Sequence, residues 1–189
     1  HKSLARKDKL TLVPEGTVQC IFFGQGSDGT VGANKNAIKI IADNTPMFAQ
    51  GYFDYDSFKA GGLTTSHLRF GPAKIGSEYY VYDSDFTAVS QQSYWNKYTT
   101  MLVQSCRNGS ILLLNTSCKT IEDLNRCMPK SMRVMIAAKN LKLMLMDASD
   151  ISFKAGLPGR INSAMQTAFF MLSGVLPQEQ AITIWKKTI

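Results

Sequence analysis

The residues best suited to chemistry lie in a glycine-rich stretch near the start of the chain. Gly24, Gly26 and Gly29 come directly after a β-rich apolar run and directly before a helical pattern. Such a turn leaves backbone N–H groups at the start of the helix without intrahelical partners, and the positive end of the helix dipole faces the gap. The stretch therefore predicts a site for a phosphate or another anion, to which Lys35 would add a full charge.

Two other interpretations of these glycines remain open. Their Gly-x-Gly-x-x-Gly spacing also satisfies the dinucleotide-binding fingerprint, for which Asp54 or Asp56 would supply the ribose-binding carboxylate. A free nicotinamide-dependent dehydrogenase would also need a catalytic acid or base, and His67 is its candidate here. Alternatively, the glycines only allow a tight strand-to-helix turn that binds nothing.

A second group of polar residues lies on a predicted strand. Residues 63–72 alternate between two faces, so His67 and Arg69 point the same way. His67 is either a hydrogen-bonded structural histidine or, with Arg69, part of an anion site or an ion pair. No cysteine, serine or second histidine stands at the spacing of a ligand set or a catalytic triad. We therefore predict no catalytic residue in this chain.

Composition limits the classes of function. The 189 residues fit one domain, which we expect over residues 15–189 after a basic linker or arm at 1–14. The net charge of +7 comes from Lys and Arg spread along the chain, which favours small anionic ligands over nucleic acid. No apolar run is long enough to cross a bilayer, so no membrane association is expected. A first residue other than Met suggests a fragment of a longer chain.

The cysteines argue against a metal site. No two of them form a C-x-x-C pair, so neither a zinc site nor an iron–sulfur cluster held by this chain alone is predicted. We expect reduced thiols. The four are Cys20, Cys106, Cys118 and Cys127.

The order of apolar runs predicts an α/β fold. Strands alternate with helices, which indicates a mainly parallel sheet with helices on both faces, a Rossmann-like three-layer arrangement with an antiparallel edge. Ligands on such sheets lie beyond the carboxyl ends of the strands, where we expect the Gly24 loop, the Lys59 loop and the 115–117 turn to converge. The predicted strands are 18–23, 47–54, 63–72, 78–82, 110–114 and 141–146, and the main helices are 32–43, 94–106, 131–140, 160–172 and 177–187.

Three long motifs resemble one known family. Residues 24–35, 51–71 and 156–177 together are similar to the third, or gamma, domain of pyruvate:ferredoxin (flavodoxin) oxidoreductases. The resemblance implies a large, oxygen-sensitive, dimeric cytoplasmic or hydrogenosomal enzyme. Such an enzyme decarboxylates pyruvate on thiamine diphosphate, passes electrons through iron–sulfur clusters to ferredoxin or flavodoxin, and transfers the acetyl group to coenzyme A.

The same resemblance divides the work among domains. Other domains of the polypeptide would hold the thiamine diphosphate, its Mg and the iron–sulfur clusters, and the gamma domain would help to hold coenzyme A. The isolated fragment would then bind without turning over. Lys59 would contact a phosphate, while Arg160 and Asn162 would either contact the ligand or hold the start of their own helix. The candidate coenzyme A site comprises Gly26, Ser27, Asp28, Gly29, Thr30, Lys35, Lys59, Gly61, Gly62, His67, Arg69, Arg160 and Asn162.

One segment departs from the family pattern. Where the family commonly has Ala-Cys-His-Asn, this chain has Ala88, Val89, Ser90 and Gln91. The change suggests a divergent branch, such as the pyruvate:NADP oxidoreductases with a fused flavoprotein, or the sulfite reductase flavoproteins that keep a related domain. A structural domain without a ligand of its own is therefore an alternative function.

Overall fold

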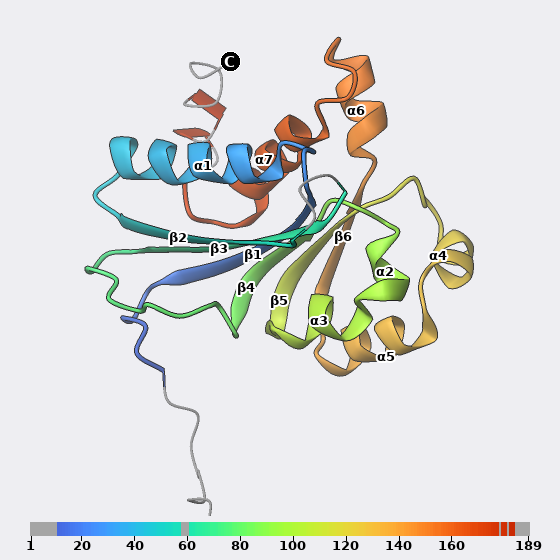
Figure 1. The fold of residues 1–189 in the computed structure, drawn as a ribbon, viewed down its shortest axis with the longest axis horizontal. Coiled ribbons are helices and arrows are strands. Elements are labelled where there is room, and N and C mark those ends of the chain that lie inside the picture. The colour runs from blue at the N-terminus through green and yellow to red at the C-terminus, as the bar shows by residue number, and fades with distance from the viewer. Residues whose placement is uncertain (1–10, 58–60, 178, 181, 184–189) are drawn as a thin grey trace, which may run out of the picture.

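A six-stranded sheet forms the middle of the molecule, seen from its edge in Figure 1. The structure, a computed structural model, describes residues 11–57, 61–177, 179–180 and 182–183. The strand order is β2-β3-β1-β4-β5-β6. The strands are β1 (Val18–Gln25), β2 (Phe48–Tyr55), β3 (Leu63–Gly71), β4 (Ser84–Val89), β5 (Cys106–Asn115) and β6 (Lys142–Met146).

Five strands run in one direction and β3 runs in the other. β1, β4, β5 and β6 pair in parallel, whereas β3 pairs antiparallel with both β1 and β2. The predicted mainly parallel sheet with an antiparallel edge is therefore confirmed. The reversal of β3 also places the connection between β2 and β3 at the carboxyl end of β1, beside the glycine loop.

Helices cover both faces of the sheet (Figure 1), as predicted. The helices α1 and α7 lie over one face, and α2, α3 and α5 lie under the other. No helix in the described ranges is long and apolar enough to cross a bilayer. The helices are α1 (Thr30–Asn44), α2 (Tyr94–Lys97), α3 (Thr99–Gln104), α4 (Ile121–Cys127), α5 (Lys130–Ala138), α6 (Ala148–Lys154) and α7 (Ile161–Leu172).

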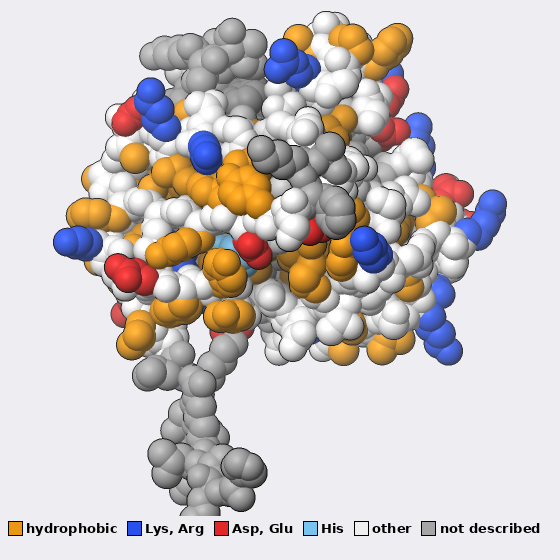
Figure 2. Space-filling view, viewed as in Figure 1, with side chains coloured by type: hydrophobic (Ala, Val, Ile, Leu, Met, Phe, Trp, Pro, Cys, Tyr) orange, Lys and Arg blue, Asp and Glu red, His pale blue; other side chains and the backbone are white. Residues whose placement is uncertain are grey.

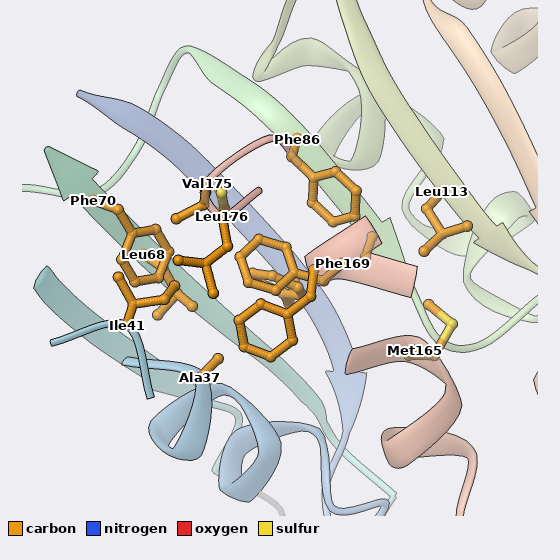
Figure 3. Packing of buried hydrophobic residues seen from close by; sticks show 14 of the residues in the cluster. Ala37, Ile41, Leu68, Phe70, Phe86, Leu113, Met165, Phe169, Val175 and Leu176 are labelled. Atoms are coloured by element: carbon orange, nitrogen blue, oxygen red, sulfur yellow. The ribbon is translucent and has the colours of Figure 1, made fainter. Parts of the chain in front are cut away.

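An aromatic cluster joins α7 to the sheet (Figure 3). The ring of Phe169 lies 5.2 Å from Phe22, 5.4 Å from Phe86 and 6.1 Å from Phe70, measured between ring centroids. Edge-to-face and tilted contacts at these distances stabilise beyond the area that they bury. The wider hydrophobic core around these rings includes Ala37 of α1. This core therefore packs both α1 and α7, the helices beside the glycine loop, against the sheet.

Two predicted elements were wrong. Residues 78–82 form no strand, because the carbonyl groups of Tyr79 and Tyr80 turn toward the Arg69 guanidinium instead of a neighbouring strand. The single helix at 94–106 is divided into α2 and α3 at Tyr98, whose φ of −128° is not helical, and Cys106 already belongs to β5. The predicted helix at 177–187 lies partly outside the described residues.

Candidate functional site

The glycine loop turns sharply between β1 and α1. A Cβ atom on Gly24 would lie 2.6 Å from the Cβ of Thr30, so only glycine allows the helix to start this close to the strand. Ser27 and Gly29 both have positive φ angles, of 78° and 83°. A positive φ at a serine is uncommon and indicates that the surrounding loop imposes it.

Asp28 holds the loop together from inside. Its Oδ2 accepts hydrogen bonds from the Gln25 N–H at 2.8 Å and the Ser90 hydroxyl at 2.9 Å, and its Oδ1 accepts one from the Thr30 N–H at 2.8 Å. The carboxylate therefore shapes the turn. Ser90 belongs to this network and was not predicted as a site residue.

Four backbone donors at the start of α1 remain available. Within the described part of the chain, no acceptor lies in hydrogen-bonding range of the N–H groups of Ser27, Gly29, Val31 and Gly32. The helix is 15 residues long, so the positive end of its dipole faces the same region. This combination suits an anion, as the sequence indicated.

The connection between β2 and β3 meets the glycine loop. The Gly26 N–H donates to the Gly62 carbonyl oxygen at 2.8 Å, and the Gly61 N–H donates to the Gly26 carbonyl oxygen at 3.4 Å. Gly61 has a φ of 78°, which favours glycine. Two of the three segments predicted to converge therefore meet, whereas no residue of the 115–117 turn lines the cavity between them. Lys59, the predicted phosphate contact, lies outside the described residues.

A cavity of about 500 Å³ opens between these two loops. Its lining residues include one with an aromatic ring, two with a carboxyl group and four with a hydroxyl group. Tyr55, Ser57 and Thr64 in this wall were not predicted as site residues, because a residue near the end of a strand carries no local signal of a cavity. The lining residues are Gln25, Gly26, Ser27, Asp28, Gly29, Val31, Gly32, Tyr55, Asp56, Ser57 and Thr64.

Asn162 joins the glycine loop from α7, far away in the sequence. A Cβ atom on Gly29 would lie 2.9 Å from Asn162 Nδ2, so the amide packs directly against the loop. The neighbouring Gln166 donates from Nε2 to the Ala33 carbonyl oxygen at 2.9 Å, which ties α7 to α1. Arg160, the other candidate from this segment, is exposed at the N-cap of α7 and does not line the cavity.

Lys35 does not line the cavity either. It lies in the second turn of α1, and its Nζ is 5.3 Å from the centroid of the Phe53 ring. The ammonium group therefore makes a cation–π contact with β2.

The structure places Arg69 apart from the glycine loop. Its side chain is 1% exposed on the face of β3 that points away from α1. It donates to the amide oxygens of Gln19 and Gln50 and to the carbonyl oxygens of Ser77, Tyr79 and Tyr80, at 2.7 to 3.2 Å. These bonds connect β1, β2 and the irregular 72–83 segment. The guanidinium group is thus engaged with protein acceptors.

His67 lies beside Arg69 and is also engaged. Its Nδ1 accepts a hydrogen bond from the Val81 N–H at 3.2 Å, and its ring stacks on Tyr80 at 4.6 Å between centroids. Little histidine surface is visible among the hydrophobic side chains of Figure 2. The pKa of His67 is lowered to about 4, chiefly by burial and in part by the Arg69 charge, while Asp54 opposes the shift. His67 is therefore neutral near pH 7.

No group of three or more metal-ligating side chains occurs among the residues that the structure describes. The four cysteines are all free thiols.

Comparisons with known proteins identify the family of this chain. A family model described as pyruvate ferredoxin/flavodoxin oxidoreductase matches residues 19–189. The chain belongs to this oxidoreductase family. The predicted resemblance is confirmed.

Relatives in the oxidoreductase family are much longer than this chain. The chain is 47% identical to the pyruvate:ferredoxin oxidoreductase of Moorella thermoacetica over 189 residues, which is 100% of the chain and 16% of that protein. It is 42% identical to the mitochondrial pyruvate dehydrogenase [NADP(+)] of Euglena gracilis over 182 residues, which is 96% of the chain and 10% of that protein. The chain thus corresponds to one part of these oxidoreductases.

Solved structures share the fold of this family member. Pyruvate oxidoreductase subunit PORC from Thermotoga maritima superposes with a TM-score of 0.70 at 18% identity, over 93% of this chain and 86% of that one. The 2-oxoglutarate:ferredoxin oxidoreductase from Magnetococcus marinus superposes with a TM-score of 0.62 at 10% identity, over 93% of this chain and 27% of that one. At these identities the likeness establishes the fold.

Proposed function

We propose that this chain is the gamma domain of a pyruvate:ferredoxin oxidoreductase and that its glycine loop helps to hold coenzyme A. One observation carries the proposal: Ser27, Gly29, Val31 and Gly32 line a cavity of about 500 Å³ at the N-terminus of α1, and their N–H groups have no hydrogen-bond partner among the described residues. Coenzyme A carries phosphate groups, which suit such a site. The 2-oxoglutarate:ferredoxin oxidoreductase that shares the fold has coenzyme A bound in its structure.

Other domains of the longer oxidoreductase would carry out the remaining steps of the reaction. We assign thiamine diphosphate with Mg, and the iron–sulfur clusters, to other domains, because no metal-binding group occurs among the described residues of this one. Oxidative decarboxylation of pyruvate to acetyl-CoA would then occur in a cytoplasmic homodimer that reduces ferredoxin or flavodoxin. This chain contributes coenzyme A contacts and interdomain packing, and alone it has no activity.

A second candidate concerns the electron acceptor. Relatives named pyruvate dehydrogenase [NADP(+)], from Cryptosporidium parvum and Euglena gracilis, are each 42% identical to this chain. This similarity favours a branch with a fused flavoprotein nearly as strongly as one with free ferredoxin. In a sulfite reductase flavoprotein the domain would be structural. Thiamine-binding and cluster-binding motifs in the flanking polypeptide would exclude that last case.

Adding a side chain to the glycine loop tests the coenzyme A site. In the full-length protein, Gly29→Val adds a side chain at a φ of 83° and 2.9 Å from Asn162 Nδ2. We expect coenzyme A affinity, measured by calorimetry, to fall at least tenfold, and Lys59→Ala to weaken binding as well. Gly76→Ala is the matched control, since Gly76 does not line the cavity and its Cβ would meet nothing within 4 Å. Unchanged affinity in Gly29→Val and Lys59→Ala would refute the site.

A further inference from the structure

Two buried hydroxyl groups on β3 have no hydrogen-bond partner among the described residues. They belong to Thr64 and Ser66, which are 5% and 0% exposed. Both side chains lie on the face of β3 that carries Leu68 and Phe70, the face covered by α1 and α7. A buried hydroxyl without a partner is energetically unfavourable, so each one requires a physical reason.

The two hydroxyl groups differ in their neighbours. Thr64 lies between Gly24 of β1 and Tyr55 of β2, and it forms part of the cavity wall. Ser66 lies between Phe22 and Phe53 and does not line the cavity. Thr30 fills the position that a side chain of Gly24 would occupy, so Thr64, which pairs with Gly24, lies near the start of α1. Rotation about its Cα–Cβ bond moves the hydroxyl between staggered positions at the wall.

The cavity around Thr64 is rich in donors. Ser27, Gly29, Val31 and Gly32 line its other side, and their N–H groups have no partner in the part of the chain that the structure describes. The Asp28 carboxylate is occupied by three donors of the protein. A ligand with several acceptor oxygens would satisfy the backbone donors and the Thr64 hydroxyl together. A phosphoryl group has this character, and hydrogen bonds to ionised acceptors are the strong ones.

We propose that Thr64 Oγ1 donates a hydrogen bond to a phosphoryl oxygen of the ligand that the glycine loop holds, and that Thr64 thereby positions this ligand. The inference rests on the proposed coenzyme A function and adds a residue from β3 to it. Ser66, two residues along the same face, has a buried hydroxyl that also lacks a partner among the described residues, and it has no such role.

The test measures coenzyme A binding by calorimetry on the full-length protein and three variants. Thr64→Val replaces the hydroxyl with a methyl group of similar size, and we expect affinity to fall about tenfold. Thr64→Ser keeps the hydroxyl and should stay within about threefold of the unmodified protein, which a purely structural role of the methyl group would not give. Ser66→Ala is the matched control and should stay within about twofold. Inorganic pyrophosphate as a second probe should show the same order, because the bond goes to a phosphoryl oxygen.

The outcomes separate the two proposals. Equal affinity in Thr64→Val and the unmodified protein would overturn the role of Thr64 while coenzyme A binding stands. Equal losses in Thr64→Val and Ser66→Ala would also overturn it, since the effect would then come from β3 packing. If the unmodified protein binds coenzyme A but not pyrophosphate, and Thr64→Val loses nothing toward coenzyme A, the phosphoryl contact is wrong. Absence of coenzyme A binding in the unmodified protein would instead refute the glycine-loop function itself.

Discussion

Acid should destabilise this chain through His67. In the folded chain, burial and, to a smaller extent, the nearby Arg69 charge lower the pKa of His67 from 6.5 to about 4. In the unfolded chain the ring takes up a proton below pH 6.5, whereas in the folded chain it does so only below about pH 4. Between these values unfolding binds a proton, so the stability that neutral His67 contributes is full above pH 6.5 and is lost as the pH falls to 4.

The magnitude follows from the shift. A difference of about 2.5 pKa units corresponds to roughly 3 kcal/mol in the free energy of unfolding between pH 7 and pH 4. His67→Gln does not titrate in this range, and its amide oxygen can still accept from the Val81 N–H. Urea unfolding of both proteins at pH 4, 5, 6 and 7, at constant ionic strength, measures the difference directly.

We expect the free energy of unfolding to fall by about 3 kcal/mol more in the unmodified chain than in His67→Gln over this pH range. Other carboxyl and histidine groups titrate in both proteins and cancel in the comparison. If the two pH profiles run parallel, His67 does not carry the shifted pKa, and the reasoning from its burial is wrong.

Two further predictions concern charged groups that hold the backbone. Asp28→Ala leaves two backbone donors and one hydroxyl without their acceptor. The free energy of unfolding, measured by urea denaturation, should therefore fall by about 2 to 4 kcal/mol. Asp56→Ala, in the same cavity wall, is the control and should change it by less than about 0.5 kcal/mol. Arg69→Met leaves five acceptors unpaired and should lower the free energy of unfolding by more than about 4 kcal/mol. Arg69→Lys should not restore the thermal midpoint of the unmodified chain, because an ammonium group has only three donors. Stability of Arg69→Lys equal to that of the unmodified chain would contradict the second prediction.

Local sequence signals predicted most of the fold. The glycine turn, the apolar runs and the polar helix starts each act within a few residues, so a single sequence suffices to recognise them. Thr120 illustrates how local such contacts are: its hydroxyl accepts from the Asp123 N–H and the Asp123 carboxylate accepts from the Thr120 N–H, a capping box at the start of α4 formed by two residues three positions apart.

Long-range side-chain contacts explain where the predictions were wrong. The aromatic run at 78–82 has the composition of a strand, but its carbonyl groups bond to Arg69 across about ten residues of sequence. The apolar pattern at 94–106 continues through Tyr98 and Cys106, yet Cys106 pairs with Ser84 of β4. Neither partner can be identified from spacing, because both depend on the tertiary fold.

Only part of the candidate site could be predicted, again because some of its contacts depend on the tertiary fold. The loop from Gly26 to Gly29 could be recognised from its spacing, and Asn162 only through the family resemblance, since it reaches Gly29 from the far end of the chain. Thr64 could not be recognised from the sequence. A threonine in an alternating strand has the same local pattern whether its hydroxyl faces a core or a cavity.

The reversed direction of β3 makes one wall of the cavity independent of the helical layers. In an all-parallel sheet, consecutive strands are joined by crossover connections, usually helices, so a change in the length of a connection disturbs a whole layer. Here one wall adjoins the connection of a simple β2–β3 hairpin. Insertions and deletions in such a connection leave the strands paired. A change of length there would therefore alter one wall of the cavity, and the packing of α1 and α7 on the sheet would stay as it is.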